Sequence, residues 1–253
     1  MLFNYHTHTK RCGHANGEDE EYVEKAIENG LKILGFSDHA PYFYPDSDYY
    51  AGYQMKTDQI FQYAESVRAL AKKYKDDIRI LCGFELEYYP DYHEEEKAFL
   101  SQVSPDYFIM GQHYIGNGQN TTGYNAKQDS EETATAYASQ VIAGLATGDF
   151  LYLAHPDMLG WNRSRERAEW EYRRICRYAK KKNIPLEINL LGLATNRVYP
   201  SRAFFQIAAE EKNRVIIGVD AHWPSAFTQK EAEAQALNLV RELGLELIDK
   251  PLL

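Results

Sequence analysis

The chain has 253 residues, 44% hydrophobic and 26% charged, so its length allows one sizeable domain or two small ones. Its formal net charge of −9 argues against a nucleic-acid groove and an anionic membrane surface, and no apolar run approaches the about 20 residues of a membrane-spanning helix. The three scattered cysteines and the absence of room for a secretion signal before residue 6 predict a cytoplasmic protein.

Short apolar runs alternate with longer amphipathic segments along the whole chain. The runs expected as strands are Leu2–His6, Ile33–Ser37, Ile78–Glu85, Tyr107–Gly111, Phe150–Ala154, Leu186–Asn189 and Val215–Val219. The segments expected as helices are residues 18–30, 56–75, 92–103, 130–147, 165–182, 201–212 and 228–243. The helical period is clearest in the second segment, which places Ile60, Ala64, Val67, Ala71 and Tyr74 on one face. This alternation is typical of parallel βα units.

Seven such units without a linker or a composition break predict a single α/β domain over residues 1–253. The count fits a closed or nearly closed barrel, and an open doubly wound sheet remains an alternative. Polar residues at the ends of many different strands favour the barrel, because strands that encircle a point can direct all of these side chains toward it.

Imidazoles and carboxylates gather where the expected strands stop. The candidate metal ligands are His6, His8, His14, His39, Glu85, His113, His155, Asp220 and His222. They are too many for one tetrahedral metal and are enough for two or three divalent ions that share a bridging carboxylate. Imidazole and carboxylate ligands suit zinc, manganese or iron(II). The remaining histidine, His93, is expected to be a solvated helix residue, and Cys12 a bystander near the site.

Strand parity refines this expectation, because residues two apart point to the same face of a strand. His6 and His8 can therefore reach one metal together, and so can Asp220 and His222. Glu85 should share its face with Gly83 and Glu87, whereas Cys82 and Phe84 should face the helices. His113 should continue the face of Ile109 and Gly111, and His155 that of Leu151 and Leu153.

These motifs resemble the polymerase and histidinol phosphatase (PHP) superfamily of metal-dependent phosphoesterases. The resemblance rests on His6-Thr-His8-Thr, His14, Asp38-His39-Ala-Pro, Glu85, His113, Ala-His155-Pro-Asp157 and Asp220-Ala-His222. It runs from residue 4 to about 224. It implies a distorted seven-stranded, TIM-like (β/α)7 barrel with a trinuclear metal centre, in agreement with the strand count.

The resemblance also implies how the ligands are divided. The first metal would be held by His6, His8, Glu85 and Asp220. Glu85 would bridge to the second metal, which His113 and His155 would complete. The third metal would be held by His14, His39 and His222.

Two neighbouring metals lower the pKa of a shared water and stabilise phosphoryl displacement, so attack on phosphorus by a metal-bridging hydroxide is expected. Asp220 and His222 are then expected to act in catalysis as well as in metal binding, with Asp220 taking a proton. Asp38 is expected to orient a ligand.

Phosphate recognition should involve arginine, because its planar fork fits phosphate oxygens. Arg163 and Arg197 follow two strands on the ligand side and are the expected catalytic and substrate-binding arginines; Arg11 is a third candidate. The alternative for each is a solvated or salt-bridged arginine. The tyrosine-rich segment 41–53, including Tyr42, is expected either to line the substrate pocket or to pack on its own aromatic residues.

Within the superfamily, the chain most resembles the histidinol-phosphate phosphatases, which implies a phosphoric monoester hydrolase of histidine biosynthesis. It departs from them at Ala194, where an arginine usually follows the Gly-Leu pair; here Arg197 comes three residues later. Another phosphate ester, such as phosphotyrosine or a nucleotide, is an alternative substrate. An amidohydrolase is disfavoured because no strand end carries a lysine, and a non-catalytic metal-binding scaffold because the expected ligands are all present.

Overall fold

The computed structural model describes residues 1–42, 52–117, 122–123, 131–158 and 165–253. For residues 122, 123 and 165–167 it describes the backbone alone. Its centre is a curled parallel sheet of eight strands in the order β1-β2-β3-β4-β7-β8-β9-β10. The strands are β1 (Phe3–Asn4), β2 (Ile33–His39), β3 (Arg79–Leu86), β4 (Tyr107–Met110), β7 (Phe150–Leu153), β8 (Leu186–Asn189), β9 (Arg214–Gly218) and β10 (Glu246–Leu247).

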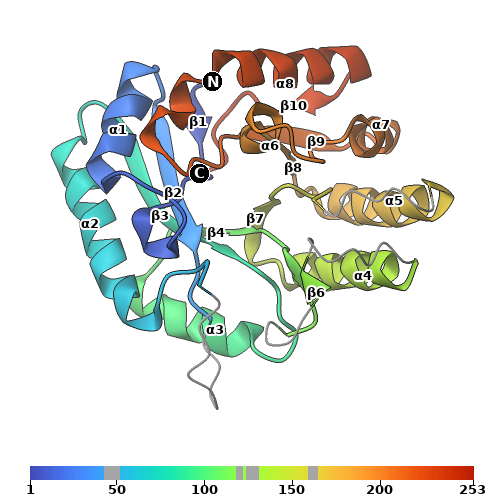
Figure 1. Ribbon diagram of the computed structural model, residues 1–253, viewed down its shortest axis with the longest axis horizontal. Helices are drawn as coiled ribbons and strands as arrows, with labels where there is room; N and C mark the ends of the chain where they lie inside the picture. The colour runs from blue at the N-terminus through green and yellow to red at the C-terminus, as the bar shows by residue number, and fades with distance from the viewer. Residues whose placement is uncertain (43–51, 118–121, 124–130, 159–164) are drawn as a thin grey trace.

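Helices surround the sheet (Figure 1). They are α1 (Asp19–Glu28), α2 (Ile60–Lys73), α3 (His93–Leu100), α4 (Glu131–Thr147), α5 (Arg165–Lys182), α6 (Leu190–Ala194), α7 (Arg202–Glu210) and α8 (Lys230–Leu243). Short 3-10 helices lie at Lys10–Cys12, Thr57–Gln59, Ser101–Val103 and Pro224–Thr228, and a hairpin pairs β5 (Tyr114–Ile115) with β6 (Thr122–Gly123). None of the helices in the described ranges is both long enough and apolar enough to span a membrane.

The predicted alternation of strands and helices is confirmed. All seven expected strands and all seven expected helices are present within a few residues of their predicted bounds. The expected count of seven strands is not confirmed, because the short β10 pairs with β9 and adds an eighth. The helix α6 was also not predicted, because five residues are too few to show a helical period.

The segments that follow β1 and β9 pair with each other across the opening of the curled sheet. Thr7 and Ala221 form a parallel bridge there. The backbone N–H of His8 donates to the carbonyl of Ala221 at 2.9 Å, and the N–H of Ala221 donates to the carbonyl of His6 at 3.2 Å. The segments that carry His6, His8 and the residues after Ala221 are thereby held side by side.

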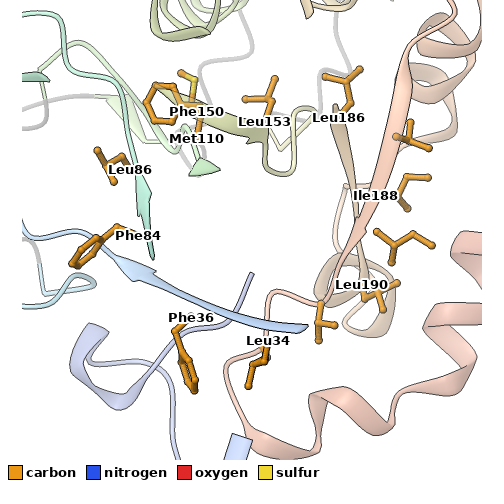
Figure 2. Packing of buried hydrophobic residues seen from close by; sticks show 14 of the residues in the cluster. Leu34, Phe36, Phe84, Leu86, Met110, Phe150, Leu153, Leu186, Ile188 and Leu190 are labelled. Atoms are coloured by element: carbon orange, nitrogen blue, oxygen red, sulfur yellow. The ribbon is translucent and has the colours of Figure 1, made fainter. Parts of the chain in front are cut away.

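The sheet separates two apolar cores, as strand parity predicts for Cys82 and Phe84, which pack outward. Figure 2 shows outward-packing residues of β2, β3, β4, β7 and β8 distributed around the curled sheet. The smaller inner core fills the space enclosed by the strands and contains residues of the opposite parity, among them Tyr5, Leu81, Tyr107 and Ile109. This inner packing forms the floor beneath the polar residues at the strand ends.

Two local expectations are wrong. His93 is not solvated: it is buried, and its Nε2 lies 2.8 Å from Oδ2 of Asp149. His155 does not continue the face of Leu153, because Leu153 packs in the outer core and the chain turns at His155, whose φ is 26°. A register shift between β4 and β7 accompanies this change of parity.

Candidate metal centre

The expected ligands converge at the carboxyl ends of the strands. His6 and His8 follow β1, His39 ends β2, Glu85 lies near the end of β3, and His113 follows β4. The strands in the second half of the sheet contribute His155, which follows β7, and Asp220 and His222, which follow β9. Because the strands are parallel, their carboxyl ends meet at one end of the sheet.

Four buried donor atoms enclose one point. Oε2 of Glu85 lies 3.4 Å from Nε2 of His6 and 3.5 Å from Nε2 of His8, and Oδ1 of Asp220 lies 3.4 Å and 3.0 Å from the same nitrogens. Zinc-to-nitrogen distances of about 2.0–2.1 Å give a ligand tetrahedron with edges of about 3.3 Å. None of the four atoms has a hydrogen-bond partner, so the donor set fits a divalent cation.

The second oxygen of Glu85 faces a different pair of histidines. Oε1 lies 2.9 Å from Nε2 of His155 and 4.0 Å from Nε2 of His113. A carboxylate whose two oxygens face separate donor sets has the geometry of a bridging ligand. Nδ1 of His39 lies 3.1 Å from Oε2, so His39 stands beside the same carboxylate.

A third group consists of histidines alone. Ring nitrogens of His14, His39 and His222 lie within 4.8 Å of one another. The Nε2 atoms of His14 and His222 are 2.9 Å apart. The thiol of Cys12 also approaches the cluster, within 4.8 Å of nitrogens of His8 and His222.

In four of the histidines, the ring nitrogen that faces away from the centre is held by an oxygen atom. Nδ1 lies 2.8 Å from Oε1 of Glu187 in His6, and 3.2 Å from Oε1 of Glu87 in His113. In His14 and His222, Nδ1 faces a backbone carbonyl at 3.1 Å. This arrangement leaves Nε2 available for a metal and is the usual environment of a metal-bound histidine.

Asp38 contacts His8 rather than the ring of the adjacent His39. Its Oδ1 lies 3.4 Å from Nδ1 of His8 and accepts from the backbone N–H of His39 at 2.9 Å. Thr9 donates its hydroxyl to Oδ2. The position of Asp38 is therefore that of a residue that orients a ligand.

The centre is rich in negative charge. Burial tends to lower the pKa of His6, but the charges of Glu187, Asp220 and Glu85 outweigh burial and raise it to about 10. Burial tends to raise the pKa of Glu85, but His39 and His6 together with a hydrogen bond from His155 hold it well below its usual value. The carboxylates thus stay ionised and require nearby cations.

Two of the residues that carry donor atoms have an unusual backbone. The φ angles of His155 and Asp220 are 26° and 54°, in a region that residues with a side chain seldom occupy. Such conformations cost free energy and persist where the surrounding structure holds them, often at functional sites.

A cavity of about 260 Å³ opens onto the cluster. Its walls include Tyr53, Tyr114, Met158, Arg197 and Tyr199 in addition to seven of the cluster residues. Nη1 of Arg197 donates to the hydroxyl of Tyr199 at 2.7 Å. A cation thus stands at a cavity next to the candidate metal positions.

Two of the other candidate substrate residues, Arg11 and Tyr42, lie elsewhere. Arg11 is buried in an ion pair, with Nη1 2.9 Å from each oxygen of Asp19, and does not line this cavity. Tyr42 is buried, and its ring lies 4.4 Å from that of Tyr89. Arg163 and most of the tyrosine-rich segment, residues 43–51, fall outside the described residues.

Several residues of the site were not predicted from the sequence. Glu187 and Asn189 lie on the inner face of β8, where the strand parity could have placed them, and Tyr199 lines the cavity. Glu87 was recognised as sharing the face of Glu85, but its contact with His113 was not predicted. These contacts join residues far apart in the sequence, so no local sequence pattern predicts them.

Comparisons with known proteins place this site in a family. The PHP domain model matches residues 4–190. The "Probable histidinol-phosphatase" of Deinococcus radiodurans is 25% identical over 96% of this chain and 94% of its own. The histidinol-phosphatase of Bacillus subtilis is 26% identical over 44% of this chain and 43% of its own.

A solved structure has the same fold. Histidinol phosphate phosphatase from Lactococcus lactis, in complex with zinc, L-histidinol and phosphate, matches with a TM-score of 0.74 and 20% identity, over 98% of this chain and 95% of that one. The family model covers more than half of the chain, and its match contains seven of the nine expected ligands. The chain therefore belongs to the PHP domain family.

Proposed function

We propose that this chain is a metal-dependent phosphate monoester hydrolase and that its substrate is histidinol phosphate. The observation that carries the proposal is the set of four buried donor atoms without hydrogen-bond partners, whose nitrogens and oxygens lie 3.0–3.5 Å apart, beside a cavity that Arg197 lines. The histidinol-phosphatase names of the relatives support the choice of substrate.

We propose two or three divalent ions of zinc, manganese or iron. His6, His8, Glu85 and Asp220 would hold the first, and Glu85, His113 and His155 the second. A third would lie among His14, His39 and His222. Bound metals would supply an activated water and neutralise phosphate charge.

The protein groups would then orient the substrate and move protons. Arg197 would bind phosphate oxygens, and Arg163 is proposed beside it from its sequence position alone. Asp220 would accept a proton from the attacking water, and Nδ2 of Asn189 holds its other oxygen, Oδ2, at 3.1 Å. His222 would act beside it, with Nδ1 3.3 Å from Oδ1 of Asp220. Asp38 would hold His8.

We also propose a closed barrel, a single domain and a cytoplasmic location. The strands β1, β2, β3, β4, β7, β8 and β9 would form one distorted, seven-stranded TIM-like barrel, with β10 as an addition at its edge. Residues 1–253 would form one domain. The bridge between Thr7 and Ala221 supports closure of the barrel. A reducing cytoplasm would suit the three cysteines, all of which are free and buried.

The test is phosphate release from a panel of esters by protein of known metal content. The panel would contain histidinol phosphate, phosphotyrosine, nucleoside monophosphates and a phosphodiester. A strong preference for histidinol phosphate is expected. Faster turnover of another monoester would overturn the substrate assignment and keep the reaction class, and no turnover by fully metallated protein would overturn both.

A further inference from the structure

Glu187 on β8 is completely buried and is surrounded by hydrogen-bond donors. Nδ1 of His6 lies 2.8 Å from its Oε1, and the hydroxyl of Tyr152 donates to the same oxygen at 3.3 Å. Its Oε2 accepts from the backbone N–H of His155 at 3.0 Å and from Nδ2 of Asn189 at 2.9 Å. Four donors from β1, β7 and β8 therefore meet on one carboxylate.

Only a carboxylate without a proton can accept all four bonds, since it offers two acceptor oxygens and no donor. A glutamine in its place would turn an amide N–H toward two of these donors. The orientation of Asn189 is independently fixed, because its Oδ1 accepts from the backbone N–H of Gly192 at 2.9 Å. Its Nδ2 also donates to Oδ2 of Asp220 at 3.1 Å, which extends the network to another candidate ligand.

The contact with His6 determines which ring nitrogen faces the centre. When Nδ1 donates to Glu187, the lone pair of the neutral ring lies on Nε2, which is 3.4 Å from both Glu85 and Asp220. The contact with His155 acts on the backbone instead, at the residue whose φ is 26°. Glu187 thus touches two candidate ligands from different strands without facing the centre itself.

The neighbouring strand leaves room for this carboxylate. A Cβ atom on Gly218 of β9 would lie 1.8 Å from Oε1 of Glu187, a distance that no real contact allows. The position of the carboxylate therefore depends on a glycine in the adjacent strand.

We propose that Glu187 is a positioning residue that sets the tautomer of His6 and the backbone turn at His155, so that both imidazoles present lone pairs to metal. This inference rests on the proposed metal centre. The groups that hold metal-bound histidines typically contribute about 10- to 100-fold to metal affinity or activity. We expect a loss of this size in the affinity for zinc when Glu187 is replaced.

The experiment compares Glu187→Gln with Glu171→Gln in competition for zinc against a chromophoric chelator. Glu171 is a matched control because it is also completely buried but pairs with Arg174 on its own helix, α5, and accepts from the hydroxyl of Thr135 on α4. We expect zinc affinity to fall about 10- to 100-fold in Glu187→Gln and to stay at the wild-type value in Glu171→Gln. The visible spectrum of cobalt-substituted protein should change only in Glu187→Gln, because it reports ligand geometry.

Gly218→Ala is the second variant, in case Glu187→Gln does not fold. It keeps every charge and displaces Glu187, so it should also weaken zinc binding. If Glu187→Gln folds and binds zinc with wild-type affinity, the inference is overturned. If Glu187→Gln does not fold, wild-type zinc affinity in Gly218→Ala overturns it instead. Zinc binding is read without substrate, so a failure of the proposed phosphatase activity would be recognised separately.

Discussion

Gly111 lies directly against Glu85, so that a Cβ atom on Gly111 would be 1.7 Å from Oε1 of that carboxylate. Glu85 therefore reaches the centre across a position where the next strand has no side chain. The same oxygen faces His155 at 2.9 Å. The location of the carboxylate is thus set jointly by its own strand and by the residue beside it.

Gly111→Ala should displace Glu85 and lower both metal content and turnover in a protein that still folds. Inserting a methyl group into packed structure costs about 1–3 kcal/mol. Metal analysis after gel filtration, together with phosphate release, checks this. Gly30→Ala is the control: Gly30 has open space around it and a φ of 81°, so alanine should cost about 1–2 kcal/mol of stability and leave the metal content unchanged.

Glu85→Gln should release metal and abolish turnover together, because it removes a carboxylate whose two oxygens face separate pairs of histidines. The loss should exceed the about 10- to 100-fold typical of residues that merely support ligands. Elemental analysis and activity of the same sample measure it. Full metal content in this variant would contradict the bridging role of Glu85.

Arg197→Ala should keep the full metal complement and impair catalysis. A hydrogen bond to a charged group contributes about 1.5–3 kcal/mol, which corresponds to a fall in kcat/KM of about 10- to 150-fold. Steady-state kinetics at saturating metal checks this. Arg202→Ala should change nothing, because Arg202 forms an exposed ion pair with Glu242 on the outer helices. Unchanged kinetics of Arg197→Ala would remove this arginine from the substrate site.

Removal of metal should lower the melting temperature as well as activity. The ionised carboxylates of Glu85 and Asp220 face the same two histidines, and a cation that binds only the folded state relieves their repulsion. At a free metal concentration 100 times Kd, binding stabilises the fold by about 2.7 kcal/mol. Scanning calorimetry before and after chelation measures the shift. A melting temperature that does not respond to zinc or manganese would contradict this prediction.

Asp149 should contribute stability that is lost in acid. Burial tends to raise its pKa, but hydrogen bonds from His93 and Lys97 outweigh burial and lower it below its usual value. A depressed pKa in the folded state gives stability that is present above the unfolded pKa and disappears as pH falls through the folded one.

The variant Asp149→Asn tests this in metal-free protein, so that metal release does not contribute. It should reduce the free energy of unfolding by about 1–3 kcal/mol at neutral pH. The difference from wild type should shrink as the pH falls below about 4, the usual pKa of an aspartate. A difference that stays constant from neutral to acid pH would show that the charge of Asp149 contributes nothing.

Much of the fold could be predicted because the relevant signals are local. The period of α2 is confirmed by its buried residues Ile60, Ala64 and Val67, and the parity of β3 by the outward packing of Cys82 and Phe84. The parity prediction is wrong at His155 because the chain leaves the strand conformation there. A single sequence does not predict such a turn.

The sequence by itself determined which residues could bind metal, since imidazoles and carboxylates stand at the ends of predictable strands. Only the tertiary structure decided what each of them contacts. The curl and register of the sheet bring Glu187 to His6 and Glu87 to His113, and turn Arg197 rather than Arg11 toward the cavity. Residue type and periodicity are properties of a few neighbouring positions, whereas these contacts depend on the packing of strands far apart in the chain.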